Sequence, residues 1–168
     1  MARSRRVFIK NACYHIIARG IRKEKIFLDD RDYERYLIIL RKYKVNFGCH
    51  IYCYCLMPNH IHIVLESPKG LKAMSGFMHN LNQTYAMFYN YKYGKVGHLW
   101  QNRYKSCVVL KDKYLLNLTS YIEYNPVRAK IVDEPEKYKW STYRARILGE
   151  NNYIVDNIDK FYAGTGLG

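Results

Sequence analysis

The chain has 168 residues, of which 49% are hydrophobic, and this composition predicts one globular domain with a sizeable core rather than a disordered protein. Its 28 Lys and Arg residues outnumber its 14 Asp and Glu residues, and the net charge of +14 predicts a polyanionic partner such as nucleic acid. No stretch approaches the roughly 20 apolar residues of a membrane span, and no apolar signal segment follows the basic N-terminus, so we expect a cytoplasmic, nucleoid-associated protein with no membrane partner.

The chain in order alternates between two periodicities. Residues that suit a pleated surface predict strands over 5–18, 49–57, 60–65 and 103–110. Apolar residues at helical spacing predict helices over 30–46, 71–93 and 112–125. Pro58 and Asn59 leave so short a link that the second and third strands should form an antiparallel hairpin. The last helix should stop near Asn125, because the residue before Pro126 is disfavoured in helical geometry.

The order of these elements predicts an α+β fold. Strand, helix, strand, strand, helix, strand (βαββαβ) is the order of a ferredoxin-like or RRM-like four-stranded antiparallel sheet, with two helices on one face. The other face of the sheet is then left free, and a C-terminal helix follows the last strand. We expect a single domain over residues 1–148 and a C-terminal tail over 149–168.

Two histidines interrupt the apolar third strand. Side chains alternate across a strand, so His60 and His62 share one face while Ile61 and Ile63 point to the other. Such a pair also arises by chance, and the alternative is two polar residues on the exposed face of a half-buried strand. His15 and His98 are expected to be packed or solvent-exposed.

The last predicted helix carries two residues that can complete a site. Tyr121 and Asn125 are four residues apart and are therefore neighbours on one helix face. Imidazole nitrogens from His60 and His62 with the amide oxygen of Asn125 would suit Mn²⁺ and tolerate Mg²⁺. A divalent cation relieves the repulsion between a phosphodiester and a nucleophile, and tyrosine is among the side chains used for covalent catalysis.

Two other tyrosines compete with Tyr121 for the role of nucleophile. Tyr114 shares its helix face but lies two turns before Tyr121 and so farther from Asn125, whereas Tyr124 points elsewhere. The chain contains 18 tyrosines, many of them among Lys and Arg residues, and this suits unpaired or hairpin nucleic acid, whose bases can stack on aromatic rings. The residues that we expect to contact DNA are basic, with one tryptophan: Arg5, Arg6, Arg19, Arg22, Lys23, Trp100, Arg103, Lys105 and Arg128.

Several segments together resemble a known family. They are the His60-Ile61-His62 strand, the later Tyr121-Ile-Glu-Tyr-Asn125-Pro-Val-Arg-Ala, and the intervening Gly97-His-Leu-Trp100-Gln-Asn-Arg-Tyr-Lys-Ser106. The early Tyr14-His-Ile-Ile-Ala-Arg-Gly20 and the late Trp140-Ser-Thr-Tyr-Arg144 fit as well. Over residues 5 to 146 the chain resembles the single-tyrosine (HUH, IS200-like) transposases, most of all the branch associated with repetitive extragenic palindromes (REP).

The resemblance implies a metal-dependent endonuclease and strand transferase that acts on single-stranded DNA beside a palindromic hairpin. In that family the tyrosine forms a 5′-phosphotyrosine intermediate and frees a 3′-hydroxyl. Mg²⁺ or Mn²⁺ is held there by the two histidines and by a polar residue four positions after the tyrosine, often Gln and here Asn125. Related enzymes are monomers or homodimers, and the sequence does not choose between them.

A different class of function also fits the charge, the tyrosines and the order of the elements. It is a non-catalytic DNA- or RNA-hairpin-binding module, in which the histidines are incidental. The two readings differ in one respect, because a binding module gives no reason for Tyr121 and Asn125 to lie on the same face of the sheet as the histidines.

Overall fold

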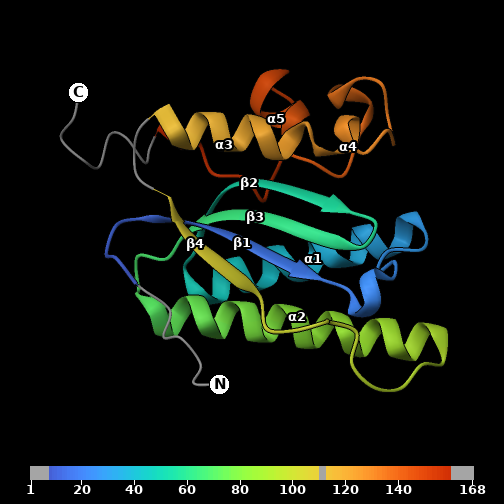
Figure 1. Ribbon diagram of the computed structural model, residues 1–168. Coiled ribbons are helices and arrows are strands. Elements are labelled where there is room, and N and C mark those ends of the chain that lie inside the picture. Colours follow the sequence, from blue (N-terminus) through green and yellow to red (C-terminus); the bar gives the residue numbers. More distant parts are fainter. Residues whose placement is uncertain (1–7, 110–112, 160–168) are drawn as a thin grey trace.

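The computed structural model describes residues 8–109 and 113–159, and four strands form one antiparallel sheet at its centre (Figure 1). The strands are β1 (Cys13–Arg19), β2 (His50–Met57), β3 (His60–Glu66) and β4 (Lys105–Val109). Their order in the sheet is β2-β3-β1-β4, so the two strands nearest in sequence, β2 and β3, form a hairpin at one edge. This order confirms the predicted ferredoxin-like sheet.

Two long helices cover one face of this sheet (Figure 1). Helix α1 (Asp30–Phe47) is capped at both ends. The side chain of Asp29 before it accepts a hydrogen bond from the backbone of Asp32, and Gly48 after it adopts a left-handed conformation. Helix α2 (Leu71–Tyr93) packs beside it. The helices bury the alternate strand residues, including Ile61, Ile63 and Leu65, in the larger of two cores.

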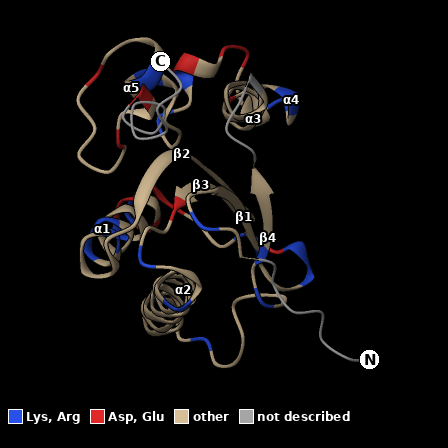
Figure 2. Ribbon diagram, turned by 90° about the vertical axis from the view of Figure 1, so that its left-hand side faces the viewer, with Lys and Arg blue, Asp and Glu red and all other residues tan. Residues whose placement is uncertain are grey.

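Short helices and turns cover the other face, which the βαββαβ units leave free, and the C-terminal helix expected after the last strand is among them. They are α3 (Lys113–Glu123), α4 (Asn125–Arg128), the 3₁₀ turn η2 (Pro135–Lys137) and α5 (Tyr143–Ile147). Figure 2 shows these elements above the sheet and the two long helices below it. The physical reason is the second set of alternate residues, because Cys53, Cys55 and Val64 are apolar and pack against α3 in a second core.

The ends of some elements differ from those predicted. Strand β1 starts at Cys13, whereas residues 8–12 form a turn and residues 5–7 lie outside the described part of the chain. Helix α3 ends at Glu123, and a separate helix, α4, begins at Asn125 with Pro126 in its first turn. Proline has no backbone N–H, and the first turn of a helix is where that donor is not needed. Tyr121 and Asn125 therefore belong to two successive helices.

The described part of the predicted tail runs along β2. Asp156 makes two hydrogen bonds to the backbone of Ile51: its N–H donates to the carbonyl of Ile51, and its side-chain carboxylate accepts from the amide of Ile51 at 2.8 Å. The same carboxylate pairs with Lys44 of α1 at 2.7 Å. Over the described residues, no helix combines the length and apolar character that crossing a membrane requires.

Candidate functional site

The histidine pair of β3 lies in the layer between the sheet and the C-terminal helices. His62 is 8% exposed and His60 is half-buried, and both side chains point to the face that α3 covers, as Val64 of the second core does. Across the sheet, His62 is flanked by Cys55 of β2 and Ile17 of β1, while His60 is flanked by Met57 and Arg19. The predicted placement of the two imidazoles on one face is thus observed.

A third histidine, His15, for which the sequence predicted only a packed or solvent-exposed position, joins the pair. Nε2 of His15 on β1 lies 2.9 Å from Nδ1 of His62, and the two rings stack with centroids 5.1 Å apart. The rings of His60 and His62 are 4.9 Å apart in an edge-to-face arrangement. Nδ1 of His60 bonds Oδ1 of Asn59 at 2.6 Å. Both rings of the pair are therefore held through Nδ1.

The surroundings keep these imidazoles neutral. Burial lowers the pKa of His60 to about 4, with a further contribution from the charge of Arg19. Burial likewise lowers the pKa of His62 to about 3, and His60, His15, Arg19 and Arg128 add to the shift. Burial also lowers the pKa of His15. Neutral imidazole is the form that binds metal ions, so the environment favours ligation over positive charge.

Tyr121 and Asn125 lie in the layer of C-terminal helices that covers the histidine face, and one arginine contacts both of them. The guanidinium of Arg128 lies over the ring of Tyr121, 3.9 Å from its centroid, and donates hydrogen bonds to Oδ1 of Asn125 at 2.6 Å and to the backbone carbonyl of Tyr121. Tyr121 is 56% exposed, so its phenol is accessible from solvent. Tyr121 and Asn125 thus remain neighbours although α3 and α4 are separate helices.

Arg128 also connects this group to the histidines. Its positive charge is among the causes that lower the pKa of His62, and it acts on the Cys55 thiol beside His62 in the sheet. Helix α3 also packs in the second core, where Ile122 lies with Cys55, the strand neighbour of His62. The helix that carries Tyr121 is therefore on the histidine face of the same chain.

The residues at this site fit a divalent cation in part. The Nε2 atoms of His60 and His62 make no hydrogen bond to any described residue, so neither nitrogen is already engaged by the protein. Within the described ranges, no three His, Cys, Asp or Glu side chains are grouped so that they could hold a metal ion. A third protein ligand would have to be an amide, and Oδ1 of Asn125 now accepts from Arg128.

The two competing tyrosines lie differently. Tyr124, which links α3 to α4, packs edge-to-face on Tyr143 with ring centroids 6.0 Å apart. Tyr114 is 59% exposed and lies near the start of α3, two helical turns before Tyr121. Of the three phenol rings, that of Tyr121 is the one covered by the arginine that also binds Asn125.

Three of the basic residues predicted to contact DNA line a hollow beside the histidines. Arg19, Arg103 and Lys105 surround a cavity of about 220 Å³ together with Ile17, which pairs with His62 on one side and with Lys105 on the other. This hollow shares Gln101, Asn102 and Arg103 with a larger one of about 690 Å³ between α2 and the segment before β4. The smaller hollow is therefore basic and lies next to the strand neighbours of the histidines, whereas the larger one is lined by amide and apolar side chains and by Arg103.

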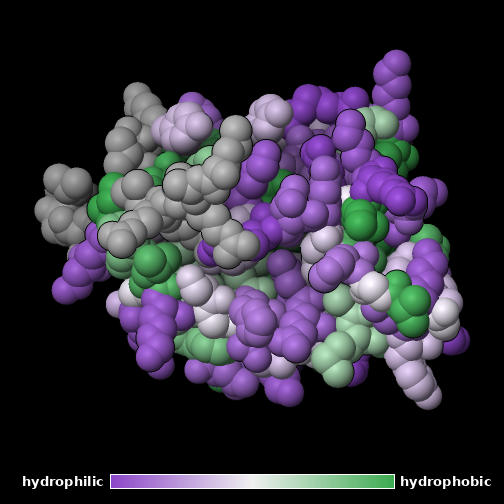
Figure 3. All heavy atoms as spheres, turned by 60° about the horizontal axis from the view of Figure 1, so that its bottom comes forward, coloured by the Kyte–Doolittle hydropathy of each residue, from purple (hydrophilic) through white to green (hydrophobic). Residues whose placement is uncertain are grey.

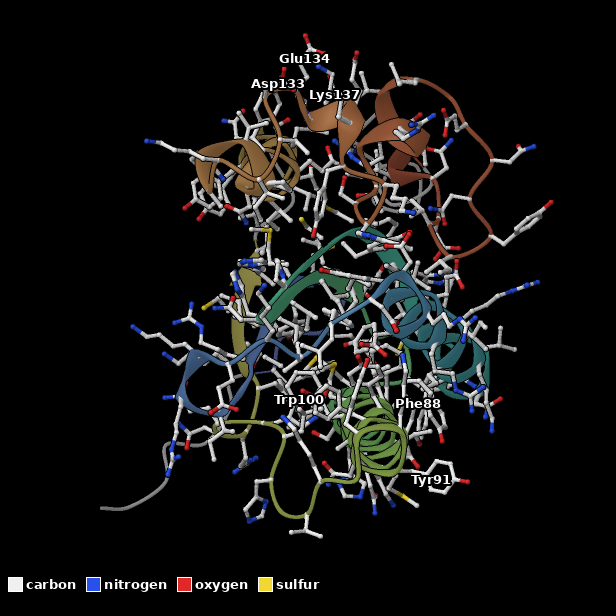
Figure 4. The ribbon with its side chains drawn as sticks, turned by 90° about the vertical axis from the view of Figure 1, so that its right-hand side faces the viewer. Phe88, Tyr91, Trp100, Asp133, Glu134 and Lys137 are labelled. Carbon is white, nitrogen blue, oxygen red and sulfur yellow. The ribbon has the colours of Figure 1, made fainter. Side chains whose placement is uncertain are left out.

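The other predicted DNA contacts are more dispersed. Arg22 and Lys23 are exposed in the 3₁₀ turn η1 (Ile21–Lys23) after β1. Trp100 points inward beside α2, where its indole N–H donates to the carbonyl of Asn82, so much of its ring packs the core (Figure 4). Arg5 and Arg6 lie outside the described residues.

Comparisons with known proteins identify the family. The family model described as "Transposase IS200 like" matches residues 8–125, a segment that contains both histidines and Tyr121 and ends at Asn125. A curated Haemophilus influenzae protein, provisionally named a REP-associated tyrosine transposase, is 28% identical over 108 residues. That match spans 57% of this chain and 60% of the relative, which is less than two thirds of its length.

A solved structure shows the same fold. It is a REP-associated tyrosine transposase bound to a REP hairpin, and it superposes with a TM-score of 0.74 at 19% sequence identity over 94% of this chain and 92% of that one. The sequence match, which covers well over half of the chain, and the shared fold agree with the geometry described above. This protein belongs to the IS200-like transposase family.

Proposed function

We propose that this protein is a metal-dependent single-stranded DNA endonuclease and strand transferase that acts next to palindromic hairpins through a tyrosine intermediate. The observation that carries the proposal is the packing of α3 on the histidine face of the sheet, together with the Arg128 guanidinium, which covers Tyr121 and binds Asn125. A hairpin-binding module would have no need for this convergence of two layers. Family membership and the hairpin held by the structural relative support the choice of substrate.

In this proposal Tyr121 is the nucleophile. Its phenolic oxygen forms a bond to phosphorus, the bond from phosphorus to the 3′ oxygen of the preceding nucleotide breaks, and that oxygen takes up a proton as the phenol loses one. The product is a 5′-phosphotyrosine and a free 3′-hydroxyl. Because the phosphotyrosine is again a diester, a second 3′-hydroxyl can attack it and rejoin a strand without a nucleotide cofactor.

His60, His62 and Asn125 would hold Mg²⁺ or Mn²⁺. When bound, the cation withdraws charge from the scissile phosphate and fixes its orientation. The low pKa values of His60 and His62 keep both imidazoles unprotonated at neutral pH. Arg128 must first release the amide oxygen of Asn125, and a DNA phosphate is a suitable alternative partner for its guanidinium.

The substrate strand would follow the two hollows. Arg19, Arg103 and Lys105 line the hollow next to the histidines and would neutralise phosphates on either side of the cleaved one. Arg22 and Lys23 of η1 extend the basic surface, and any role of Arg5 and Arg6 belongs to the segment before the described residues. Trp100 borders the larger hollow, where its partly exposed ring can contact a base.

The test is formation of a covalent adduct on denaturing gels. Wild-type protein with a labelled hairpin oligonucleotide should give a protein–DNA band that requires Mg²⁺ or Mn²⁺. Tyr121→Phe should bind the hairpin with unchanged affinity and give no band, whereas the matched variants Tyr114→Phe and Tyr124→Phe should retain the band. His62→Ala should abolish cleavage with either metal.

Two results would change the assignment. An adduct that survives in Tyr121→Phe but disappears in Tyr114→Phe or Tyr124→Phe would transfer the nucleophilic role to that residue. Tight hairpin binding by wild-type protein without an adduct under any metal condition would leave the non-catalytic binding module as the function.

A further inference from the structure

The histidines of the candidate site are held by neighbours that have no assigned role. A metal ligand of this kind uses one ring nitrogen for the cation, and the hydrogen bond made by the other nitrogen decides where the proton lies. His60 and His62 are both engaged through Nδ1, one by Asn59 and the other by His15. The chemistry of these two contacts can be followed atom by atom.

The contact between Asn59 and His60 has one direction. Nδ2 of Asn59 donates to the backbone carbonyl of Lys23 at 3.1 Å, and a carbonyl can only accept, so the amide orientation of Asn59 is fixed. Oδ1 of Asn59 therefore faces Nδ1 of His60, and since an amide oxygen also only accepts, the imidazole must donate. His60 thus carries its proton on Nδ1 and a lone pair on Nε2.

The turn that presents Asn59 is itself fixed. The carbonyl of Asn59 accepts from the amide of Gly20, and the carbonyl of Pro58 accepts from Ile26, both within 2.9 Å. A Cβ atom at Gly20 would lie 2.5 Å from the carbonyl oxygen of Glu24, so no larger residue fits there. The loop after β1 consequently holds Asn59 in place, and through it the ring of His60.

The contact between His15 and His62 allows two directions, and burial distinguishes them. If His15 donated, His62 would carry its proton on Nε2, where no described residue accepts it and where the ring is only 8% exposed. If His62 donates, the second N–H belongs to His15, which is half-buried and can reach water. An N–H without a protein partner costs more on His62, which is less exposed to water than His15, so the second arrangement is favoured.

We propose that His15 is a positioning residue, which together with Asn59 holds both histidines of the pair in the Nδ1-protonated form, so that each presents the lone pair of Nε2 to the cation. This inference rests on the proposed function for the identity of the cation, but the tautomers themselves are a property of the free protein. The pairing of β1 with β3 brings His15 and His62 together, since Ile17, two residues after His15, is the cross-strand neighbour of His62.

The first experiment reads the tautomers directly. Long-range ¹⁵N–¹H correlation spectra of histidine-labelled, metal-free protein at pH 7.5 should show His60 and His62 with the proton on Nδ1. His15→Phe retains a stacking ring but removes the acceptor, and it should move the proton of His62 to Nε2 while leaving His60 unchanged. His15→Gln restores an acceptor and should restore the Nδ1 form. His98→Phe, at an exposed histidine in the segment between α2 and β4, is the matched control and should change neither.

The second experiment measures metal affinity without catalysis. Titration of DNA-free protein with Mn²⁺, followed by electron paramagnetic resonance, should show about a 10- to 100-fold weaker affinity for His15→Phe, as for other residues that orient a metal ligand. His15→Gln should recover most of the loss. Asn59→Asp keeps the acceptor and should stay closer to wild type than Asn59→Ala does.

The outcomes separate this inference from the proposed function. A wild-type spectrum with the His62 proton on Nε2, or a His15→Phe variant identical to wild type in both tautomer and Mn²⁺ affinity, would overturn the role of His15. Nδ1-protonated histidines in a protein that binds no Mn²⁺ would support the tautomer assignment and overturn the metal dependence instead.

Discussion

At the scale of single residues, the main property of the candidate site is the protonation state of its histidines. His60, His62 and His15 are kept neutral because they are removed from water, whereas the guanidinium of Arg128 lies over the ring of Tyr121. The three imidazoles can accept protons only at a cost in folding free energy. Their low pKa values should therefore affect the free energy of unfolding as well as metal binding.

We expect the metal-free protein to lose stability in mild acid. The unfolded chain binds protons at His60 and His62 near pH 6.5, but the folded chain does so only near pH 4 and pH 3, so the free energy of unfolding should fall as pH drops from 6.5 to about 4. The slope should reach up to about 1.4 kcal/mol per pH unit for each histidine, and stability should not depend on these groups above pH 6.5.

Urea denaturation with a chelator present, repeated across this pH range, measures the slope. His62→Asn removes one titrating group and should flatten the curve, while His79→Asn, at an exposed position on α2, should not. A slope that His62→Asn leaves unchanged would show that other groups cause the acid sensitivity.

At the scale of elements, one buried ion pair attaches the C-terminal helices to each other. Glu123 at the end of α3 is 1% exposed, and its carboxylate accepts from Arg146 of α5 at 2.8 Å and from the hydroxyl of Thr142 at 2.7 Å. Arg146 also donates to Thr119 of α3 at 2.8 Å, and the backbone of Thr142 donates to Tyr54 of β2. The helix that carries Tyr121 is fixed to the sheet through this network.

Removal of the arginine should be costly. Arg146→Met leaves the Glu123 carboxylate buried without its charged partner and should lower the free energy of unfolding by about 3–5 kcal/mol, as for other broken buried pairs. Adding Glu123→Gln should recover much of the loss, because the remaining group is then neutral. The control is Arg144→Met, at another arginine of α5, which removes an exposed ion pair with Glu150 and should have little effect on thermal unfolding. Equal losses for Arg146→Met and Arg144→Met would contradict the role of burial.

The elements show what the sequence could and could not predict. Strands β2 and β3 and helices α1 and α2 follow from local periodicity, and their predicted ends differ from the observed ones by no more than about a residue. The cover on the second face and the break before Asn125 depend on how distant segments pack, which no periodicity encodes. In the same way His60 and His62 were found because they are neighbours on one strand, whereas His15 meets them only through the β1–β3 register.

At the scale of the whole molecule, positive charge is spread over all three layers (Figure 2). On the side formed by α2, hydrophilic side chains occupy most of the visible face and hydrophobic ones lie in separate small patches (Figure 3). Charged pairs such as Asp133, Glu134 and Lys137 sit at the outer side of the C-terminal layer (Figure 4). Not all of this charge can contact one DNA strand, so binding measurements must separate local contacts from the general field.

The salt dependence of DNA binding makes this separation. Each phosphate of a single strand that the protein neutralises contributes about 0.7 to the magnitude of the slope of log affinity against log salt concentration. Lys105→Gln, beside the histidines, should reduce the slope by about that amount, whereas Lys42→Gln, exposed on α1 across the sheet, should leave it unchanged. Fluorescence anisotropy with a hairpin oligonucleotide between 50 and 300 mM salt, roughly the range in which such slopes are linear, provides the measurement. Equal slopes for the two variants would place the strand elsewhere.

The position of Tyr121 also predicts that one chain supplies both the tyrosine and the histidines of each site. Because α3, which carries Tyr121, packs on the histidine face of its own chain, a mixture of Tyr121→Phe and His62→Ala proteins should form no covalent adduct. Neither protein then contains a complete site. The band should reappear only if two chains exchange their tyrosine helices, and its recovery in the mixture would contradict the arrangement described here.

The register of the central strands has a practical consequence for following the protein in solution. Cys107 on β4 is exposed and faces His15 across the sheet, whereas Cys13, Cys49, Cys53 and Cys55 are buried. Burial raises the pKa of the Cys49, Cys53 and Cys55 thiols, which suppresses the reactive thiolate. A maleimide dye or spin label added to the unaltered protein should therefore attach at one point, one strand away from the histidine cluster. Its emission or mobility would report arrival of a DNA strand without any engineered cysteine.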